Sequence, residues 1–470
     1  MNVRNLIAPT TASRFKNRAP RAARTIATLY ALVIFIGGLL LTLPFSRTEG
    51  KFGGVLDAMF TSVSAVCVTG LSTVNVETYW TPAGHLVILL LIKVGGLGIL
   101  SLSTLIGMLL SRRVGIRSQM VSATESANLS AGDVRKTLAR IVIVASAIEA
   151  VSALVMTLRF WLGYDYDLGR AIWYGVFHSV SSFNNAGFAL YGDNLIGFAA
   201  DPYIILATCF NVVVGGLGFL VLFELGRRIA GRVEARRVGG VIESKFHWTL
   251  TTRIVLWATA VLLLGGTAYI LLIEWSNPHT LGPMDLGTKL LSAFAFSVYA
   301  RTAGFNSIDI SQLDPTALLG TDILMFIGGG SGGTAGGIKV TTVTVLIFIV
   351  WTEIRGATAV NIGNRRLPRS IQRQALTIIS LAFVLVISAT VVLHLISPFS
   401  TDQLIFEVIS AFGTVGLSTG ITGSLPALGQ LVLMMLMFVG RLGTVLVASS
   451  LAARVTQVHY ELPKERPLIG

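Results

Sequence analysis

Four windows of the chain align without gaps: FTSVSAVCVTGLST (60–73), FHSVSSFNNAGFAL (177–190), FAFSVYARTAGFNS (294–307) and FEVISAFGTVGLST (406–419). Each window begins with Phe and reaches a glycine ten residues later, at Gly70, Gly187, Gly304 and Gly416. These glycines are 117, 117 and 112 residues apart. A regular spacing of this kind indicates that the chain is built from four degenerate repeats.

The composition is typical of a membrane protein. Of the 470 residues, 53% are hydrophobic and only 13% are charged, and the mean hydropathy is +0.74. Eight apolar stretches of about 20 residues, each long enough to cross a bilayer, are separated by short polar connections. We therefore predict an all-α polytopic membrane protein, and the even number of spans puts both termini on the same side.

The basic residues are concentrated in a few segments. Of the 36 Lys and Arg residues, 27 lie in the segments 1–24, 112–140, 227–253, 355–373 and 454–470. Because cytoplasmic loops carry an excess of basic residues, we expect these segments and both termini to be cytoplasmic. The net charge of +13 is then explained by cytoplasmic loops beside anionic lipid rather than by a nucleic-acid partner.

The cysteines do not indicate redox chemistry, and the N-terminus does not indicate a cleaved signal peptide. Cys67 and Cys209 lack neighbours of the disulfide or metal-binding kind. The first apolar run, from Ile26 to Leu43, has no small-residue cleavage site, so we predict a retained first helix rather than a removed signal.

Each repeat predicts the same succession of elements. We expect first helices at roughly 25–44, 138–163, 249–274 and 372–396, and second helices at roughly 82–110, 202–229, 317–356 and 425–453. Between them lies a helix of about ten residues, which is too short to cross a hydrocarbon layer of ~30 Å and must enter and leave on the same side. The predicted units are a basic cytoplasmic N-terminus (1–24), four repeats (25–111, 137–229, 249–356 and 372–453) and a cytoplasmic tail (454–470).

Four re-entrant elements have a consequence for the centre of the protein. Irregular backbone at membrane depth is tolerated only inside protein or around a water-filled path. We therefore expect pseudo-fourfold symmetry around a central ion pore. The alternative is that the four glycines only allow helices to pack closely.

The residues at the four glycines suit a cation filter. Main-chain carbonyls can replace the hydration shell of an ion, and glycine tolerates the backbone angles that turn them inward. No Asp or Glu lies in these stretches, which argues against calcium selection. The predicted filter, with a cation bound at backbone carbonyls, consists of four glycine segments: Val68, Thr69, Gly70 and Leu71; Asn185, Ala186, Gly187 and Phe188; Thr302, Ala303, Gly304 and Phe305; and Thr414, Val415, Gly416 and Leu417.

Charged residues near the filter need partners or water. Arg301 is expected behind the filter, bonded to carbonyls or to an acid. The second helices share VGGLG at 94–98 and 214–218, whereas 439–443 reads VGRLG, with Arg441 in place of a glycine. In the pore Arg441 acts as a barrier to cations, and the alternative is a buried arginine paired with an acid. We expect Lys93 to pair with Glu149 in a structural role.

A glycine-rich loop interrupts the second helix of repeat 3. As one helix, residues 317–356 would span ~60 Å, about twice the hydrocarbon thickness, so the helix must break. The stretch lacks the Ser/Thr after Lys339 that a phosphate-binding loop requires. We predict a gate, with a passive linker as the alternative, in this glycine-rich loop (328–339): Gly328, Gly329, Gly330, Ser331, Gly332, Gly333, Thr334, Ala335, Gly336, Gly337 and Lys339, acting with Arg441.

The single-glycine segments, RTAGFN (301–306) and GGSGGTAGGIK (329–339) resemble the Trk/Ktr/HKT superfamily of potassium transporters, over essentially the whole chain after residue 24. Since no additional helix pair precedes the first repeat, the Ktr-type membrane subunit is the more similar type. The resemblance implies a bacterial plasma-membrane protein, potassium as the transported ion because Gly70 is not serine, and sodium as a possible activator. It also implies a homodimer under a cytoplasmic ring of nucleotide-binding regulatory subunits of the RCK type, with no covalently bound cofactor.

Two other functions fit the sequence less well. A sodium-coupled secondary cation transporter would place its sites at broken helices, but such proteins usually have two inverted halves rather than four parallel repeats. An intramembrane enzyme needs clustered catalytic groups, whereas the histidines are scattered, at His85, His178, His247, His279, His394 and His459. We therefore expect no enzymatic activity.

Overall fold

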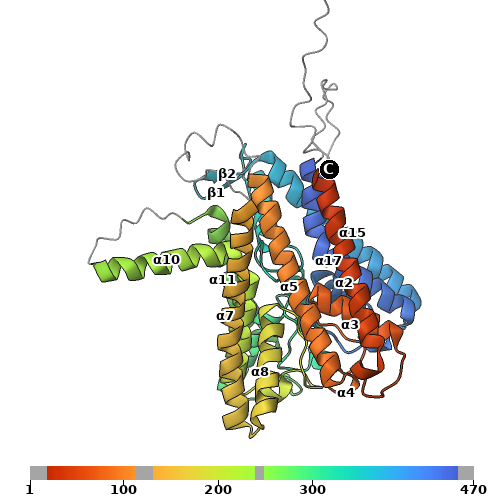
Figure 1. Cartoon of the computed structure of the whole chain (residues 1–470). Coiled ribbons are helices and arrows are strands. Elements are labelled where there is room, and N and C mark those ends of the chain that lie inside the picture. Colours follow the sequence, from red (N-terminus) through yellow and green to blue (C-terminus); the bar gives the residue numbers. More distant parts are fainter. Residues whose placement is uncertain (1–17, 112–130, 239–247, 454–470) are drawn as a thin grey trace, which may run out of the picture.

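The structure is a computed structural model that describes residues 18–111, 131–238 and 248–453. Most long helices run roughly parallel to one axis, and the shorter helices lie between them (Figure 1). Several predictions lie outside the described residues: the basic segment up to residue 17, residues 112–130 and 239–247, and the tail 454–470.

The four repeats contain the same three kinds of helix. The first helices are α2 (Arg18–Thr42), α7 (Ala131–Gly163), α11 (Leu250–Glu274) and α15 (Arg369–Ile396). The short helices are α3 (Val55–Cys67), α8 (Leu168–Phe183), α12 (Leu286–Tyr299) and α16 (Thr401–Gly413). The second helices are α5 (Pro82–Ser111), α9 (Pro202–Leu217), α13 (Pro315–Phe326) and α17 (Ala427–Ala453). In each repeat the short helix therefore lies between the other two in sequence.

Small elements complete the described chain. They are η1 (Pro44–Ser46), α4 (Val76–Tyr79), η2 (Ile196–Phe198), η3 (Ile310–Gln312), η4 (Thr422–Ser424) and an antiparallel pair of two-residue strands, β1 (Asn361–Ile362) and β2 (Arg365–Arg366). Two further helices, α10 (Phe219–Val238) and α14 (Val340–Ile354), continue the second helices of repeats 2 and 3.

Three of the four short helices begin at a side-chain cap, whereas α3 begins at Gly54 without one. Asp167, Asp285 and Ser400 accept hydrogen bonds from backbone N–H groups at the starts of α8, α12 and α16. Three of the four repeated phenylalanines, Phe60, Phe177 and Phe406, are fully buried, whereas Phe294 is partly buried. The short helices are thus held inside the bundle, and their C-terminal ends lead directly into the glycine segments.

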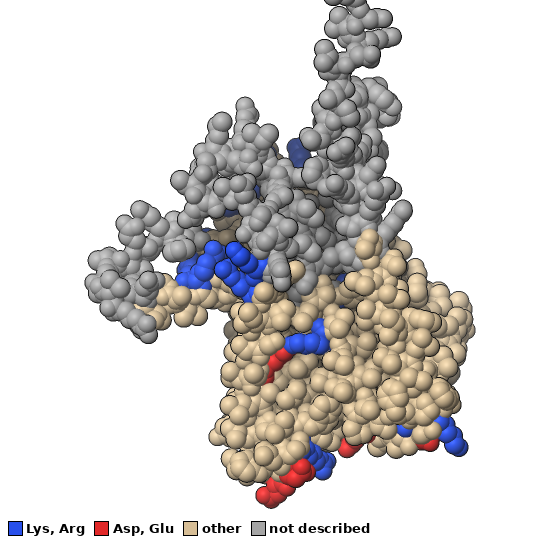
Figure 2. Space-filling model, in the orientation of Figure 1, with Lys and Arg blue, Asp and Glu red and all other residues tan. Residues whose placement is uncertain are grey.

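Exposed apolar side chains cover the outside of the bundle. Leu272 is 80% exposed and Leu395 79% exposed, as expected of residues that face lipid. On the face shown in Figure 2, charged residues gather near the two ends, and a wide uncharged band lies between them with one basic and acidic pair inside it.

Three helices of the described part are long and apolar enough to cross a membrane: Lys136–Gly163, Leu250–Glu274 and Arg369–Ile396. The bent pair Pro202–Leu217 and Phe219–Val233 makes a fourth if it is counted as one span. Fewer helices pass this test than the eight apolar stretches of the sequence. One reason is that the second helix of repeat 3 is divided into α13 and α14, which have 12 and 15 residues.

The second helix of repeat 2 differs from our expectation. We predicted one helix over roughly 202–229, but α9 ends at Leu217 and α10 leaves it at an angle of 104°. Gly218 lies at the bend with φ 93° and ψ 146°, a region that is essentially restricted to glycine. A Cβ on Gly218 would lie 2.7 Å from the carbonyl oxygen of Ser331, so the glycine-rich loop occupies the space beside the bend.

We predict that Gly218→Ala destabilises the protein by about 1–3 kcal/mol, because alanine must adopt a disfavoured backbone conformation and meets the Ser331 carbonyl. Thermal unfolding in detergent, followed by loss of the monodisperse peak, measures the effect. Gly226→Ala in α10 is the matched control, since a Cβ there meets nothing within 4 Å. Equal stability of the two variants would contradict the prediction.

Candidate ion pathway

The four glycines of the repeats lie together at the centre of the bundle. A Cβ on Gly70 would lie 2.5 Å from the carbonyl oxygen of Ala186, one on Gly187 2.8 Å from that of Ala303, and one on Gly304 2.6 Å from that of Val415. A Cβ on Gly416 would in turn meet the carbonyl oxygen of Thr69. Each glycine thus faces the next repeat, and the last faces the first, which closes a ring.

The four glycine segments share one unusual backbone conformation. Every glycine has a positive φ, between 70° and 98°. The residue two positions earlier is also left-handed, although it carries a side chain: Val68, Asn185, Thr302 and Thr414 have φ between 49° and 68°. Left-handed residues other than glycine are uncommon and strained. Four in the same position show that the segments are held in one shape by their surroundings.

Hydrogen bonds to the short helices hold the backbone N–H groups of the glycine segments. The N–H groups of Thr69, Ala186 and Val415 donate to the carbonyls of Ser64, Ser181 and Ser410, each at 2.8 Å. In repeat 3, where Val298 stands at the position of the serine, the N–H of Ala303 donates instead to the carbonyl of Tyr299 at 3.0 Å. The glycine segments are therefore held to the preceding short helices through their backbone N–H groups.

A buried carboxylate that the sequence reasoning missed supports the chain after the fourth segment. Glu407 in α16 is fully buried and accepts hydrogen bonds from Ser418, Thr419 and Thr422. The sequence signal was an acidic residue directly after Phe406, within the otherwise apolar run 404–409.

The glycine-rich loop lies against two glycine segments and the end of α9. The hydroxyl of Thr334 is 3.1 Å from the carbonyl of Phe183 and 3.0 Å from Oδ1 of Asn185. On the other side, a Cβ on Gly336 would meet the hydroxyl of Thr414. The loop therefore contacts the second and the fourth segment at the ends that follow the short helices.

The broken end of α9 pairs with the same loop. The N–H groups of Gly330 and Thr334 donate to the carbonyls of Gly216 and Gly215, at 2.8 and 3.0 Å. After the bend, the N–H of Phe219 donates to the carbonyl of Gly332 at 3.2 Å. The carbonyls that are left free where α9 stops are thus satisfied by the loop.

Three cationic side chains bind carbonyl oxygens of the glycine-rich loop. Arg301 is 7% exposed and donates to Gly328 at 3.2 Å. Lys339 donates to Ala335 and Arg441 to Thr334, each at 2.5 Å. Of the two partners expected for Arg301, a carbonyl and not an acid is the one observed.

Arg441 is almost fully buried, with 3% of its surface exposed. Within the part of the chain that the structure describes, its Nε and Nη2 atoms have no hydrogen-bond partner, and no ion pair involves this residue. An arginine without a carboxylate partner leaves its positive charge uncompensated at the level of the loop.

The shared motif of the second helices has a packing role. Gly95, Gly215 and Gly440 each lie so close to a short helix of the same repeat that a Cβ would collide with the carbonyl of Val66, Phe183 or Phe412. These three carbonyls belong to the residues four positions before the repeat glycines. The first glycine of the motif thus allows the second helix to pack tightly behind its own glycine segment.

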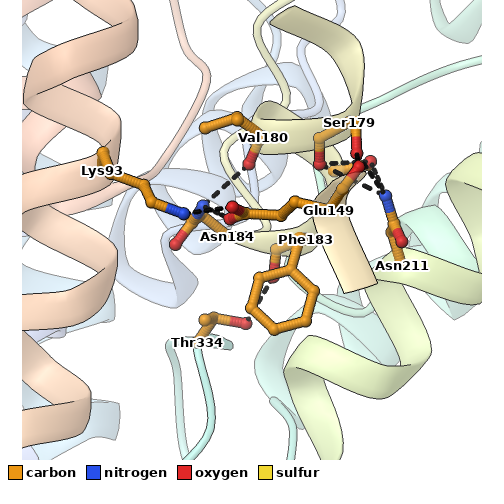
Figure 3. A network of polar contacts seen from close by, with 9 residues as sticks. Lys93, Glu149, Ser179, Val180, Phe183, Asn184, Asn211 and Thr334 are labelled. Atoms are coloured by element: carbon orange, nitrogen blue, oxygen red, sulfur yellow. Dashed lines mark hydrogen bonds and ion pairs between the residues drawn. The ribbon is translucent and has the colours of Figure 1, made fainter. Parts of the chain in front are cut away.

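The predicted pair of Lys93 and Glu149 is confirmed. Nζ of Lys93 in α5 binds Oε2 of Glu149 in α7, and the second carboxylate oxygen, Oε1, accepts a hydrogen bond of 3.0 Å from Nδ2 of Asn184 (Figure 3). Glu149 is 6% exposed. This pair joins repeats 1 and 2 beside the second glycine segment.

Comparison with known proteins identifies the class of protein to which the chain belongs. Residues 3–458 match the family model described as TrkH, cation transport protein. The solved structure of the potassium transporter TrkH from Vibrio parahaemolyticus superposes with a TM-score of 0.70 over 97% of this chain and 87% of that one, at 17% identity, which shows a common fold. The chain is thus a polytopic membrane protein with a transporter fold.

Curated relatives narrow the assignment. The potassium/sodium uptake protein NtpJ of Enterococcus hirae is 35% identical over 95% of this chain and 96% of that protein. The Ktr system potassium uptake protein B of Vibrio alginolyticus is 35% identical over 95% and 94%, and that of Bacillus subtilis 34% identical over 89% and 90%. The chain belongs to the TrkH family of cation transport proteins, and the resemblance inferred from its sequence is confirmed.

Proposed function

We propose that this protein takes up potassium across the bacterial plasma membrane through a filter formed by the four glycine segments. The observation that carries the proposal is the ring in which each repeat glycine faces a carbonyl of the next repeat. Carbonyl oxygens arranged around an axis replace the hydration shell of a monovalent cation. The names of the relatives, which are potassium or potassium/sodium uptake proteins, agree with potassium as the ion.

Uptake of ⁸⁶Rb⁺ into proteoliposomes tests the proposal. We expect external K⁺ to compete with ⁸⁶Rb⁺ far better than Na⁺ does, and empty liposomes serve as the control. Equal competition by Na⁺ and K⁺ would contradict a potassium filter. Sodium is then added at equal concentration on both sides: faster uptake identifies sodium as an activator, whereas uptake that requires a sodium gradient identifies a coupled secondary transporter.

The glycine-rich loop is the gate in this proposal. The contacts of Thr334 with the second glycine segment and of Gly336 with the fourth support this role. A small cavity of about 20 Å³, enough for about one water molecule, lies among α9, α11 and α12 and is also lined by Asn185, Arg301 and Gly329. In this proposal, conduction requires the loop to move away from the two glycine segments that it contacts.

We predict that Thr334→Val raises the basal flux about fivefold, since one hydrogen bond worth about 1 kcal/mol no longer holds the loop against the second glycine segment. Initial rates of ⁸⁶Rb⁺ uptake without any regulatory partner measure the effect. Thr342→Val in α14 is the matched control, because it removes the same hydroxyl outside the loop. An unchanged rate in Thr334→Val would remove this contact from the gating mechanism.

A cytoplasmic nucleotide-binding subunit controls the gate in this proposal, and two copies of the chain form the membrane unit. Both termini then lie in the cytoplasm. The basic residues of α10, among them Arg227, Arg228 and Arg232, support this orientation, since α10 lies where Figure 2 shows a patch of basic side chains. Because Gly218 joins α10 to the loop contacts of α9, a partner bound to α10 has a direct route to the gate.

A further inference from the structure

A polar cluster lies between repeats 1 and 2 and ends at the second glycine segment (Figure 3). Its charged members are Lys93 in α5 and Glu149 in α7. Glu149 is fixed at two points against α8: Oε1 accepts from Asn184 at 3.0 Å, and its backbone carbonyl accepts from the hydroxyl of Ser179 at 2.6 Å. The carboxylate therefore has a defined position relative to the short helix.

Asn184 is the residue through which this cluster reaches the glycine segment. It follows α8 directly, and its Nδ2 also donates to the carbonyl of Val180 at 2.8 Å. The next residue, Asn185, has a positive φ of 58° and begins the second glycine segment. Asn184 thus fixes the point at which the chain leaves the helix for the strained conformation.

Helix α5 confines Asn184 from the other side. A Cβ on Gly96 would collide with Oδ1 of Asn184, and Gly96 lies one turn after Lys93 on the same helix. The same helix therefore supplies both the charge that holds Glu149 and the surface that limits the movement of Asn184.

An ion pair in this place is not explained by stability alone. Removing two charges from water costs several kcal/mol for each ion, and well-packed apolar residues of similar volume are often equally stable. An apolar pair, however, offers no acceptor for the amide of Asn184. The part of the cluster that cannot be replaced by packing is thus the hydrogen bond to the residue before the glycine segment.

We propose that Glu149, oriented by Lys93, is a positioning residue that sets the geometry of the second glycine segment and thereby the preference for potassium over sodium. The inference rests on the proposed function of these segments as the filter. Glu149 and Lys93 act through Asn184 and do not themselves contact the ion.

Two double variants separate the hydrogen bond from the charge. Lys93→Met with Glu149→Gln removes both charges but keeps an acceptor for Asn184, whereas Lys93→Met with Glu149→Leu removes both charges and the acceptor. The measurement is the ratio of ⁸⁶Rb⁺ to ²²Na⁺ uptake in proteoliposomes. We expect the Leu variant to lower this ratio about fivefold, as for loss of one hydrogen bond, and the Gln variant to restore it to within about twofold of the unmodified protein.

Two further variants control for general damage. Asp201→Asn weakens another ion pair of α7, between the partly exposed Arg159 and the buried Asp201, and is expected to leave the ratio unchanged. If the Leu variant does not fold, Gly96→Ala displaces Asn184 without touching the ion pair, and Gly265→Ala, where a Cβ meets nothing within 4 Å, is its control. A lower ratio in Gly96→Ala alone then supports the proposal.

The outcomes distinguish the inference from the proposed function. If the unmodified protein prefers rubidium but neither the Leu variant nor Gly96→Ala changes the ratio, the positioning role is wrong and the filter remains. If both double variants lower the ratio equally, the charge and not the hydrogen bond matters, and the proposal as stated is overturned. If the unmodified protein shows no preference, the filter assignment itself is wrong and the inference fails with it.

Discussion

Replacing Gly70 with serine is expected to lower the selectivity for potassium over sodium by about tenfold, which corresponds to about 1.4 kcal/mol. The Cβ of the new residue would lie 2.5 Å from the carbonyl oxygen of Ala186, so that a carbonyl of the neighbouring segment must move. The φ of 96° is also unfavourable for any residue with a side chain. Competition of Na⁺ with ⁸⁶Rb⁺ uptake measures the change.

Gly50→Ser is the matched control for this substitution. Gly50 has a positive φ of 64°, but a Cβ there meets nothing within 4 Å, so the variant has the backbone strain without the collision. Unaltered selectivity in Gly70→Ser, with the protein intact, would show that the ring of glycines does not select the ion.

Replacing Arg441 with alanine is expected to raise the basal cation flux by about tenfold or more. The side chain donates a charged hydrogen bond to the Thr334 carbonyl, and such a bond contributes about 1.5–3 kcal/mol. Its loss weakens the closed position of the glycine-rich loop and removes an uncompensated positive charge that repels cations. Uptake of ⁸⁶Rb⁺ without a regulatory partner is the measurement.

Arg441→Lys separates the two contributions, because lysine keeps the charge but not the geometry of the guanidinium group. A flux between those of the alanine variant and the unmodified protein is expected. A lower flux in Arg441→Ala, with normal yield and a monodisperse profile, would instead assign Arg441 a purely structural role.

The sequence was sufficient to predict the membrane class, the family and which four glycines correspond to one another. These predictions rest on composition and on the spacing of residues along the chain, neither of which depends on contacts between distant segments. It was also sufficient to pair Lys93 with Glu149, since two opposite charges in apolar helices need each other. In both cases a simple rule, a fixed repeat spacing or the need of a charge in an apolar helix for a partner, leaves few alternatives.

The bend at Gly218 could not be predicted in the same way. The motif VGGLG occurs in α5 and in repeat 2, yet Gly98 remains within a helix while Gly218 has a positive φ. The difference comes from residues 331–333, which pack beside Gly218 and are more than 100 positions later in the chain. The contact of Thr334 with Asn185 was missed for the same reason, since it joins repeats 2 and 3 across a sequence separation of 149.

The closed ring of four segments comes from a single polypeptide, and this has a consequence for how such a protein can change. In an assembly of four identical subunits, a substitution beside the axis appears four times. Here the position occupied by glycine at Gly96 and Gly216 is an arginine only at Arg441. Covalent linkage of the repeats thus permits one charge at this level instead of four, and lets each quarter of the ring specialise independently of the other three.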